Sequence, residues 1–199
     1  RRQRQMCIRD SYEITVRDSD VEAIRAQIPY EIKSEVVQPG SHRLRIPALR
    51  PILLDSFRDK VIPSEYLWAS EGQRWALLQG LMDSDGCIGR EKSQSVYVST
   101  IRQLAESVRE LLWSLGIKNA MTVGPSSRYG KPTSGTLYTI RFTTFDDQPT
   151  SRLKRKYDRK RERTKKTRSC FHYLQDIQPL PYRVKMRCIQ VDSPSRCYL

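Results

Sequence analysis

The fold is decided by residues 78–86, which read LQGLMDSDG. They continue an apolar stretch that begins at Trp75, and the Ser70-x-x-Gln73 pattern before it is typical of a helix N-terminus. The stretch is apolar nearly all round, which predicts a helix buried on more than one side. Gly80 costs such a helix about 1 kcal/mol relative to alanine. Close approach of a second helix is the usual compensation, so the pattern favours a helix–helix contact at Gly80.

Two carboxylates follow at the C-terminal end of this helix, Asp83 and Asp85. The helix dipole disfavours a carboxylate there by about 0.3–1 kcal/mol. A divalent cation would reverse that penalty, since Mg²⁺ takes carboxylate and carbonyl oxygens and holds substrate phosphates. One interpretation is therefore phosphodiester hydrolysis by metal-activated water. The other is an ordinary Asp-x-Asp-Gly turn, because Asp and Gly are common in turns. The residues alone leave both open.

The same stretch resembles the signature of the LAGLIDADG (DOD-type) homing endonucleases that inteins carry. It departs from that signature at Gln79, Met82 and Ser84. The resemblance covers about residues 11–150, and its flanks are residues 62–67 (IPSEYL), residues 69–71 (ASE), Ser99-Thr100 and residues 103–105 (QLA).

The resemblance implies an α+β fold of two pseudo-symmetric αββαββα halves, with antiparallel sheets forming a saddle over DNA. The first half is expected to be incomplete, with its own signature helix upstream of residue 11. Gly80 and Asp83 are expected at the interface of the two signature helices. Asp85 is expected to be the catalytic residue and to bind Mg²⁺, helped by the backbone carbonyl of Ser84. A protein with both repeats is expected to be a monomer.

The rest of the chain predicts elements that fit this order. Ser19-x-x-Glu22 and Thr100-x-x-Gln103 resemble capping boxes, Pro29 and Gly116 close the helices that follow, and Pro39-Gly40 is typical of a hairpin turn. The first 60 residues repeat the later pattern weakly, which favours an internal duplication. The expected strands are 12–16, 31–37, 42–46, 87–98, 117–123 and 136–145, with a short helix over 49–58 and a loop over 124–135.

A polar sheet face is the predicted DNA surface. Tyr138, Ile140 and Phe142 alternate with polar residues, so one face of this strand suits the core and the other suits DNA. An ordinary solvated sheet is the alternative. His42 and His172 are expected to be incidental, and Lys118 or Lys131 is expected to polarise the scissile phosphate, as the resemblance implies. The DNA-binding candidates are Lys33, Arg43, Arg45, Arg90, Lys92, Gln94, Arg128, Lys131 and Arg141.

Positive charge is concentrated in one segment. The chain has a net charge of +14, and residues 152–168 hold +9 of it, from eleven Lys/Arg and two acids. Nucleic acid is the usual partner of such a protein, although a charge run is also often a solvated linker. We expect a partial first repeat over 11–69, a second repeat over 70–150 and a basic linker over 151–170.

The C-terminal end carries a second resemblance. Residues 187–195 (RCIQVDSPS) resemble the penultimate block of intein splicing domains, so 171–199 is expected to be a small all-β, Hint-like fragment. The resemblance makes Cys188 a splicing residue, whereas the residue alone favours a buried strand cysteine. Residues 1–10 are expected to be an artefactual or disordered N-terminus. Splicing needs an initial Cys or Ser, a Thr-x-x-His block and a terminal His-Asn pair, and this sequence has none of them. It is therefore expected to be truncated at both ends.

These features predict a Mg²⁺-dependent, intein-encoded homing endonuclease that cuts double-stranded DNA, with host exteins in the full precursor. The alternatives are a degenerate LAGLIDADG module that only binds DNA and an intein that only splices; a general RNA-binding protein is weaker. Five scattered cysteines without a C-x-x-C pair suggest neither a zinc site nor disulfides. No segment has the signature of a signal peptide or membrane span, so a cytoplasmic, nucleoid-associated protein is expected.

Overall fold

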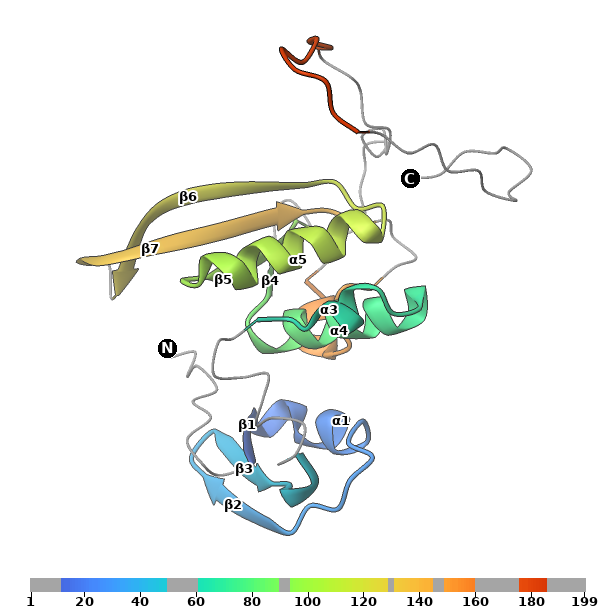
Figure 1. Ribbon diagram of the computed structural model, residues 1–199. Helices are drawn as coiled ribbons and strands as arrows, with labels where there is room; N and C mark the ends of the chain where they lie inside the picture. Colours follow the sequence, from blue (N-terminus) through green and yellow to red (C-terminus); the bar gives the residue numbers. More distant parts are fainter. Residues whose placement is uncertain are drawn as a thin grey trace.

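The computed structural model describes residues 12–49, 61–89, 94–128, 131–144, 149–159 and 176–185. They form two antiparallel sheets with helices packed on them, which confirms the predicted α+β class (Figure 1). Among these residues, no helix is both long enough and apolar enough to cross a membrane.

The larger part of the fold has the predicted order αββαββα. The short helix α3 (Ser64–Leu67) precedes it and packs on α4 and α5. The sheet is antiparallel with strand order β4-β5-β7-β6. Its elements are α4 (Glu71–Ser84), β4 (Cys87–Ile88), β5 (Ser95–Ser99), α5 (Arg102–Ser114), β6 (Asn119–Arg128), β7 (Lys131–Phe142) and α6 (Lys154–Tyr157).

The N-terminal part repeats the middle of this order. A strand, a helix and a hairpin follow one another, and the sheet order β1-β3-β2 matches the order β5-β7-β6. This topology supports the predicted duplication. In such a repeat the counterparts of α4 and β4 would precede residue 12, outside the described residues. The elements are β1 (Glu13–Arg17), η1 (Asp18–Asp20), α1 (Val21–Arg25), β2 (Ser34–Gln38), β3 (Ser41–Arg45) and η2 (Pro47–Leu49).

Each part has its own core. In the larger one, Leu78 and Met82 of α4 pack with Val108 and Leu111 of α5, all with no exposed surface. In the smaller one, Leu44 is fully buried with the nearby valines of β1 and α1. Burial of these apolar side chains stabilises each part, and a groove lies between the two parts.

Two predicted helix caps are wrong. Asp20 rather than Ser19 is the N-cap residue of α1, and the Ser19 hydroxyl donates to the Asp20 carboxylate instead. α1 also ends at Arg25, before the predicted stop at Pro29. α5 begins after Ile101, because the Ser99 hydroxyl accepts the Ile101 N–H in a local turn. Local side-chain hydrogen bonds of this kind compete with helix capping.

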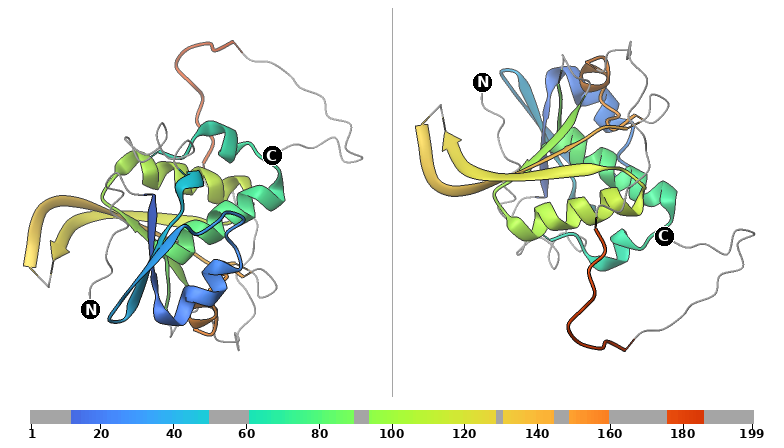
Figure 2. Two further views of the ribbon diagram at one scale, coloured as in Figure 1. Left: turned by 90° about the horizontal axis from the view of Figure 1, so that it is seen from below. Right: turned by 90° about the horizontal axis from the view of Figure 1, so that it is seen from above.

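The predicted loop over 124–135 is also wrong, because most of it is strand. β6 and β7 continue pairing as far as Arg128 and Lys131, with an irregularity between Pro125 and Ser127. Ser126 and Thr133 are hydrogen-bonded across the two strands. Figure 2 shows this hairpin curving away from the body of the molecule. The hairpin turn at Pro39-Gly40 is confirmed, with Gly40 at φ +78°.

Some of the predicted elements lie wholly or partly outside the described residues, or in described residues without regular secondary structure. The expected helix over 49–58 has only the short η2 at its start, and its remainder lies outside the described residues. Residues 176–185, which lie in the expected Hint-like fragment, contain neither helix nor strand. The Hint-like fragment, and residues 1–10, stay predictions.

Candidate functional site

The α4 helix is fixed at its N-terminus by the predicted capping box. The Gln73 N–H donates to the Ser70 hydroxyl at 3.4 Å, and the Ser70 N–H donates to the Gln73 side-chain oxygen at 3.1 Å. Two N–H groups that lack helical partners are therefore satisfied. The helix runs without a break from this cap to Ser84.

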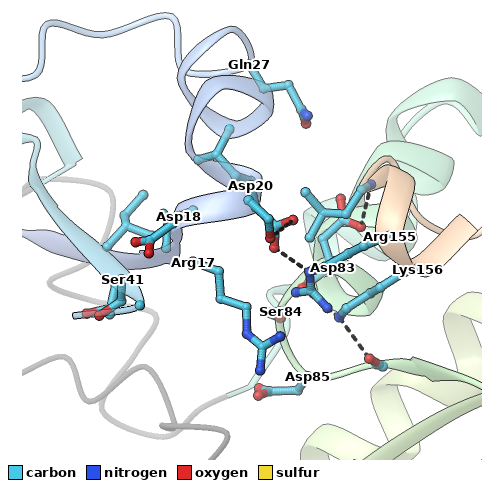
Figure 3. A pocket seen from close by; sticks show the side chains of 18 of the residues that line it. Arg17, Asp18, Asp20, Gln27, Ser41, Asp83, Ser84, Asp85, Arg155 and Lys156 are labelled. Carbon is cyan, nitrogen blue, oxygen red and sulfur yellow. Dashed lines mark hydrogen bonds and ion pairs between the residues drawn. The ribbon is translucent and has the colours of Figure 1, made fainter. Parts of the chain in front are cut away.

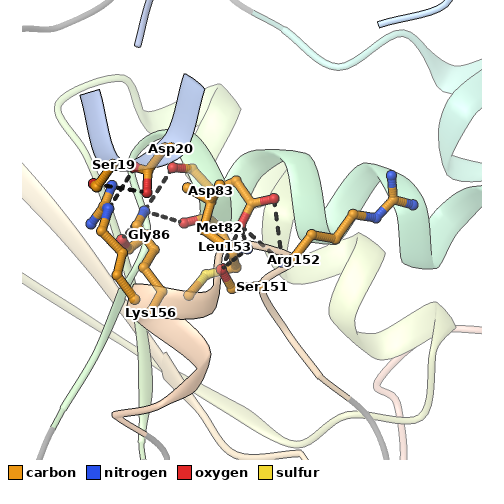
Figure 4. A network of polar contacts seen from close by, with 10 residues as sticks. Ser19, Asp20, Met82, Asp83, Gly86, Ser151, Arg152, Leu153 and Lys156 are labelled. Atoms are coloured by element: carbon orange, nitrogen blue, oxygen red, sulfur yellow. Dashed lines mark hydrogen bonds and ion pairs between the residues drawn. The ribbon is translucent and has the colours of Figure 1, made fainter. Parts of the chain in front are cut away.

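Asp83, near the other end of α4, binds a distant segment of the chain. Its carboxylate accepts hydrogen bonds from the Ser151 hydroxyl (2.5 Å) and from the N–H groups of Arg152 (3.1 Å) and Leu153 (3.4 Å). Charge-assisted bonds of this kind are stronger than neutral ones. Asp83 thus ties residues 151–153, the start of the expected basic linker, to the end of α4 (Figure 4). This segment is packed rather than solvated, while the division of the chain into domains stays a prediction.

Lys156 occupies the position where a cation was expected to offset the helix dipole. Its side chain is buried, and Nζ donates to the carbonyl oxygens of Met82 (2.6 Å), Asp83 (2.7 Å) and Gly86 (2.8 Å). An ammonium group at the C-terminus of a helix interacts favourably with the dipole and with carbonyls that lack helical partners. Burial first, and then the charge of Arg155, lower the pKa of Lys156 to about 8, although Asp83 and Asp85 act in the opposite direction.

Asp85 is the C-cap residue of α4, and its side chain is exposed. None of the residues that the structure describes hydrogen-bonds or forms an ion pair with its carboxylate. Burial raises the pKa of Tyr97 to about 12, and the negative charge of Asp85 contributes to this. Asp85 is therefore available to a ligand, whereas Asp83 is not.

Asp85 opens on a groove of about 1430 Å³ between the two parts of the fold. One side is formed by β1, η1, α1 and the turn at residues 38–41, and the other by the end of α4 and by α6 (Figure 3). In Figure 3 the Arg17 side chain points from β1 towards Asp85. The groove joins residues that are more than 60 positions apart in the chain.

The other acids of the groove have partners. Asp20 is buried, and its carboxylate accepts a hydrogen bond from Arg155 at 2.5 Å. Asp18 lies 3.4 Å from His42. Among the described residues, no cluster of three or more His, Cys, Asp or Glu side chains could hold a metal ion. The exposed Asp85 carboxylate is of the type that a hard divalent cation binds, and DNA phosphate or another acid would have to complete such a site.

The two glycines of the motif have different surroundings. Gly80 is exposed on the groove side of α4, and a Cβ there would meet no atom within 4 Å. The expected contact with a second helix is therefore not formed within the described residues. Gly86 is buried, and a Cβ would lie 2.6 Å from the Cα of Met82. Gly86 thus allows the close approach of backbone that Gly80 was predicted to allow.

The register of the two sheets places three of the DNA-binding candidates. Arg43 and Arg45 lie on the face of the first sheet opposite the buried Leu44. Arg141 lies on the face opposite Ile140 and Phe142, as predicted, and donates to Thr122 at 2.9 Å. His42 lies on the Leu44 side, where Nδ1 is 2.6 Å from Glu35.

The other candidates are placed only in part. Lys33 is exposed beside β2, Gln94 precedes β5, and Lys118 precedes β6. Arg128 and Lys131 are register partners in β6 and β7, with side chains outside what the structure describes. Arg90, Lys92, His172 and Cys188 lie outside the described residues.

Lys156 and Arg155 were not predicted as site residues. Both lie in a run where eleven of seventeen residues are basic, so charge alone does not distinguish them. The only signal is the apolar Leu153 three residues before Lys156, a spacing that puts both on one side of a helical turn. Leu153 is indeed buried with Lys156.

Residues 72–169 match the family model described as a LAGLIDADG-like domain. The chain carries a LAGLIDADG-like domain. The matched residues include α4, the second sheet and the segment of Lys156.

A replicative DNA helicase DnaB of Mycobacterium intracellulare is 35% identical over 141 residues, which are 71% of this chain and 24% of that protein. The chain thus spans about a quarter of this relative. Solved structures of the homing endonuclease I-DmoI overlap with 66% of this chain and 72% of theirs. Mesophilic variants have 14% identity and a TM-score of 0.43, and a complex with DNA and Mn has 14% identity and a TM-score of 0.44.

Proposed function

We propose that the LAGLIDADG-like domain is part of an intein-borne homing endonuclease that cuts double-stranded DNA at a specific site with the help of a divalent cation, expected to be Mg²⁺. The observation that carries the proposal is the Asp85 carboxylate, which is exposed and unpaired among the described residues at the C-terminal end of α4. Such a carboxylate is a ligand that a hard cation prefers. The helix dipole adds no further need for a cation, because Lys156 already interacts with the carbonyls at this end of α4.

In this proposal the chain's own residues bind and orient, while the cation, when bound, supplies the activated water and stabilises the charge of the phosphate. Asp85 and the Ser84 carbonyl hold one side of the cation. Arg43, Arg45 and Arg141 on the two sheet faces contact DNA and fix its register. Water adds to phosphorus, and one P–O bond of the DNA backbone breaks, leaving a phosphate end and a hydroxyl end.

The groove beside Gly80 supports a further part of the proposal. A second signature helix, with the second catalytic acid, packs along the exposed Gly80 face and fills the groove. The matching topologies of the two sheets support such a duplication. The similarity to the DnaB helicase supports the intein context. The aligned residues make up only 24% of that protein, as expected for a segment that is inserted in a longer chain.

The test is cleavage of a defined DNA. The complete reading frame is expressed and incubated, with and without Mg²⁺, with helicase-gene DNA in which the sequences flanking the aligned segment are joined without it. We expect Mg²⁺-dependent double-strand cleavage that is lost in Asp85→Asn. Asp158→Asn is the matched control, since Asp158 is the exposed C-cap residue of α6 and pairs with Lys154.

The second candidate function is DNA binding without cleavage. It is favoured by the finding that the described residues contain no complete cluster of metal ligands. DNA that is shifted in a gel but stays uncut with every divalent cation would support this candidate and contradict the first one.

A further inference from the structure

Lys156 is the buried cation of the site, and three observations separate it from the other basic residues of its segment. It is 3% exposed, whereas the side chain of Lys154, two residues before it, is 86% exposed. Its three contacts are to backbone carbonyls, and no carboxylate is paired with it among the described residues. A surface lysine that binds DNA would not be enclosed in this way.

The three carbonyls flank the residues of the proposed cation site. Those of Met82 and Asp83 precede Ser84-Asp85, and that of Gly86 follows. One ammonium group therefore holds both sides of the turn that carries Asp85 (Figure 4). The Ser84 carbonyl, a proposed ligand, is not among the three.

The segment that carries Lys156 is itself held in place. Asp83 binds residues 151–153, and Arg155 forms its ion pair with the buried Asp20 of the N-terminal part. Arg152 also donates to Gln79 of α4 at 2.7 Å. Lys156 is thus fixed on both sides by contacts to two different parts of the fold.

We propose that Lys156 is the positioning residue of this site: its ammonium group fixes the turn at residues 82–86 so that the Asp85 carboxylate and the Ser84 carbonyl point at one cation. The inference rests on the proposed function. Groups that orient metal ligands typically change metal affinity by about 10–100-fold when they are altered. Lys156 would act through backbone geometry and would touch neither the cation nor DNA.

The test compares Lys156→Arg with Lys154→Arg in the full chain. Arginine keeps the positive charge. Its planar guanidinium group, however, cannot donate to all three carbonyls in the way that the compact ammonium group of lysine does. NMR measures the carbonyl ¹³C shifts of Met82, Asp83 and Gly86 and the Hα–Hβ couplings that report the Asp85 side-chain rotamer. Mn²⁺ alone is then titrated, and the broadening of Ser84–Gly86 signals gives the midpoint of binding.

We expect Lys156→Arg to shift the three carbonyls, change the Asp85 couplings and raise the Mn²⁺ midpoint about tenfold, while Lys154→Arg changes none of them. Shifted carbonyls with unchanged couplings and an unchanged midpoint would reduce Lys156 to a static helix cap and overturn the proposal. A Mn²⁺ midpoint in Lys156→Arg like that of wild type, together with tighter binding in Lys156→Met, would mean that its charge alone matters, and would also overturn it.

Two further outcomes of the experiment can be distinguished from those above. If Mn²⁺ does not broaden Ser84–Gly86 even in wild type, the proposed cation site fails, and the Asp85 couplings in Lys156→Arg still decide whether Lys156 positions this residue. If Lys156→Arg does not fold, correlations through the hydrogen bonds from the wild-type Lys156 ammonium to the three carbonyl carbons decide the matter, and their absence contradicts the proposal.

Discussion

At the scale of single residues, the close backbone approach that the sequence predicts at Gly80 is found at Gly86 instead. Gly80 has open space around it, and Gly86 is in contact with the Met82 backbone. In this chain Gly80→Ala should raise the free energy of unfolding by up to about 1 kcal/mol, because alanine favours the helix. Gly86→Ala should lower it by about 1–3 kcal/mol through overpacking. Urea denaturation measures both.

Gly72 provides the control, since it lies in the first turn of the same helix with no atom within 4 Å of an added Cβ. If Gly80→Ala destabilises this chain more than Gly72→Ala does, the face of α4 around Gly80 is already occupied, and there is no open groove beside it. In a complete protein with a second helix on this face, the sign for Gly80→Ala should reverse.

Glu35 offers a pH-dependent prediction on the first hairpin. Its hydrogen bonds with Arg25 and then with His42 hold the pKa of Glu35 below the usual 4.5. The folded state therefore favours the ionised carboxylate, and its contribution to stability is present above pH 4.5 and is lost as pH falls below it. A ¹³C NMR titration of the Glu35 carboxyl should show the lowered pKa, and Arg25→Ala should raise it towards 4.5. An unchanged pKa in Arg25→Ala would exclude Arg25 as the main cause.

At the scale of elements, the α4 helix and its surroundings show how far sequence reasoning extends. The capping box, the hairpin turn and the alternation of β7 are local patterns, and all three were predicted correctly. The caps at Ser19 and Thr100 failed because a neighbouring side chain forms another hydrogen bond. The contacts of Lys156 join positions about 70 residues apart, so no local pattern could predict them.

The two carboxylates at the end of α4 differ in the partners that they have. Asp83 accepts three hydrogen bonds from residues 151–153, whereas Asp85 accepts none from the described residues. Asp83→Asn should lower the free energy of unfolding by about 1.5–3 kcal/mol and speed amide hydrogen exchange at Arg152 and Leu153. Asp85→Asn should change stability by less than about 0.5 kcal/mol. Equal losses in the two variants would contradict this division.

At the scale of the whole molecule, the net charge of +14 does not translate directly into DNA contacts. Part of the basic run serves internal contacts, since Lys156 is buried on α4 and Arg155 is paired with Asp20. The two sheets, in contrast, present Arg45 and Arg141 on exposed strand positions away from the cores. Lys156 and Arg155 should therefore contribute less to DNA binding than Arg45 and Arg141 do.

Salt dependence of DNA binding measures this difference. Each phosphate contact that is lost reduces the slope of log K against log salt by about one. Arg45→Ala and Arg141→Ala should each reduce the slope by about one, measured by fluorescence anisotropy with duplex DNA over a KCl series. Arg155→Ala removes the same charge from an internal ion pair and should leave the slope nearly unchanged, while it lowers stability because Asp20 stays buried without its partner. If Arg155→Ala reduces the slope as much as the sheet variants do, Arg155 contacts DNA phosphate directly, and the prediction is wrong.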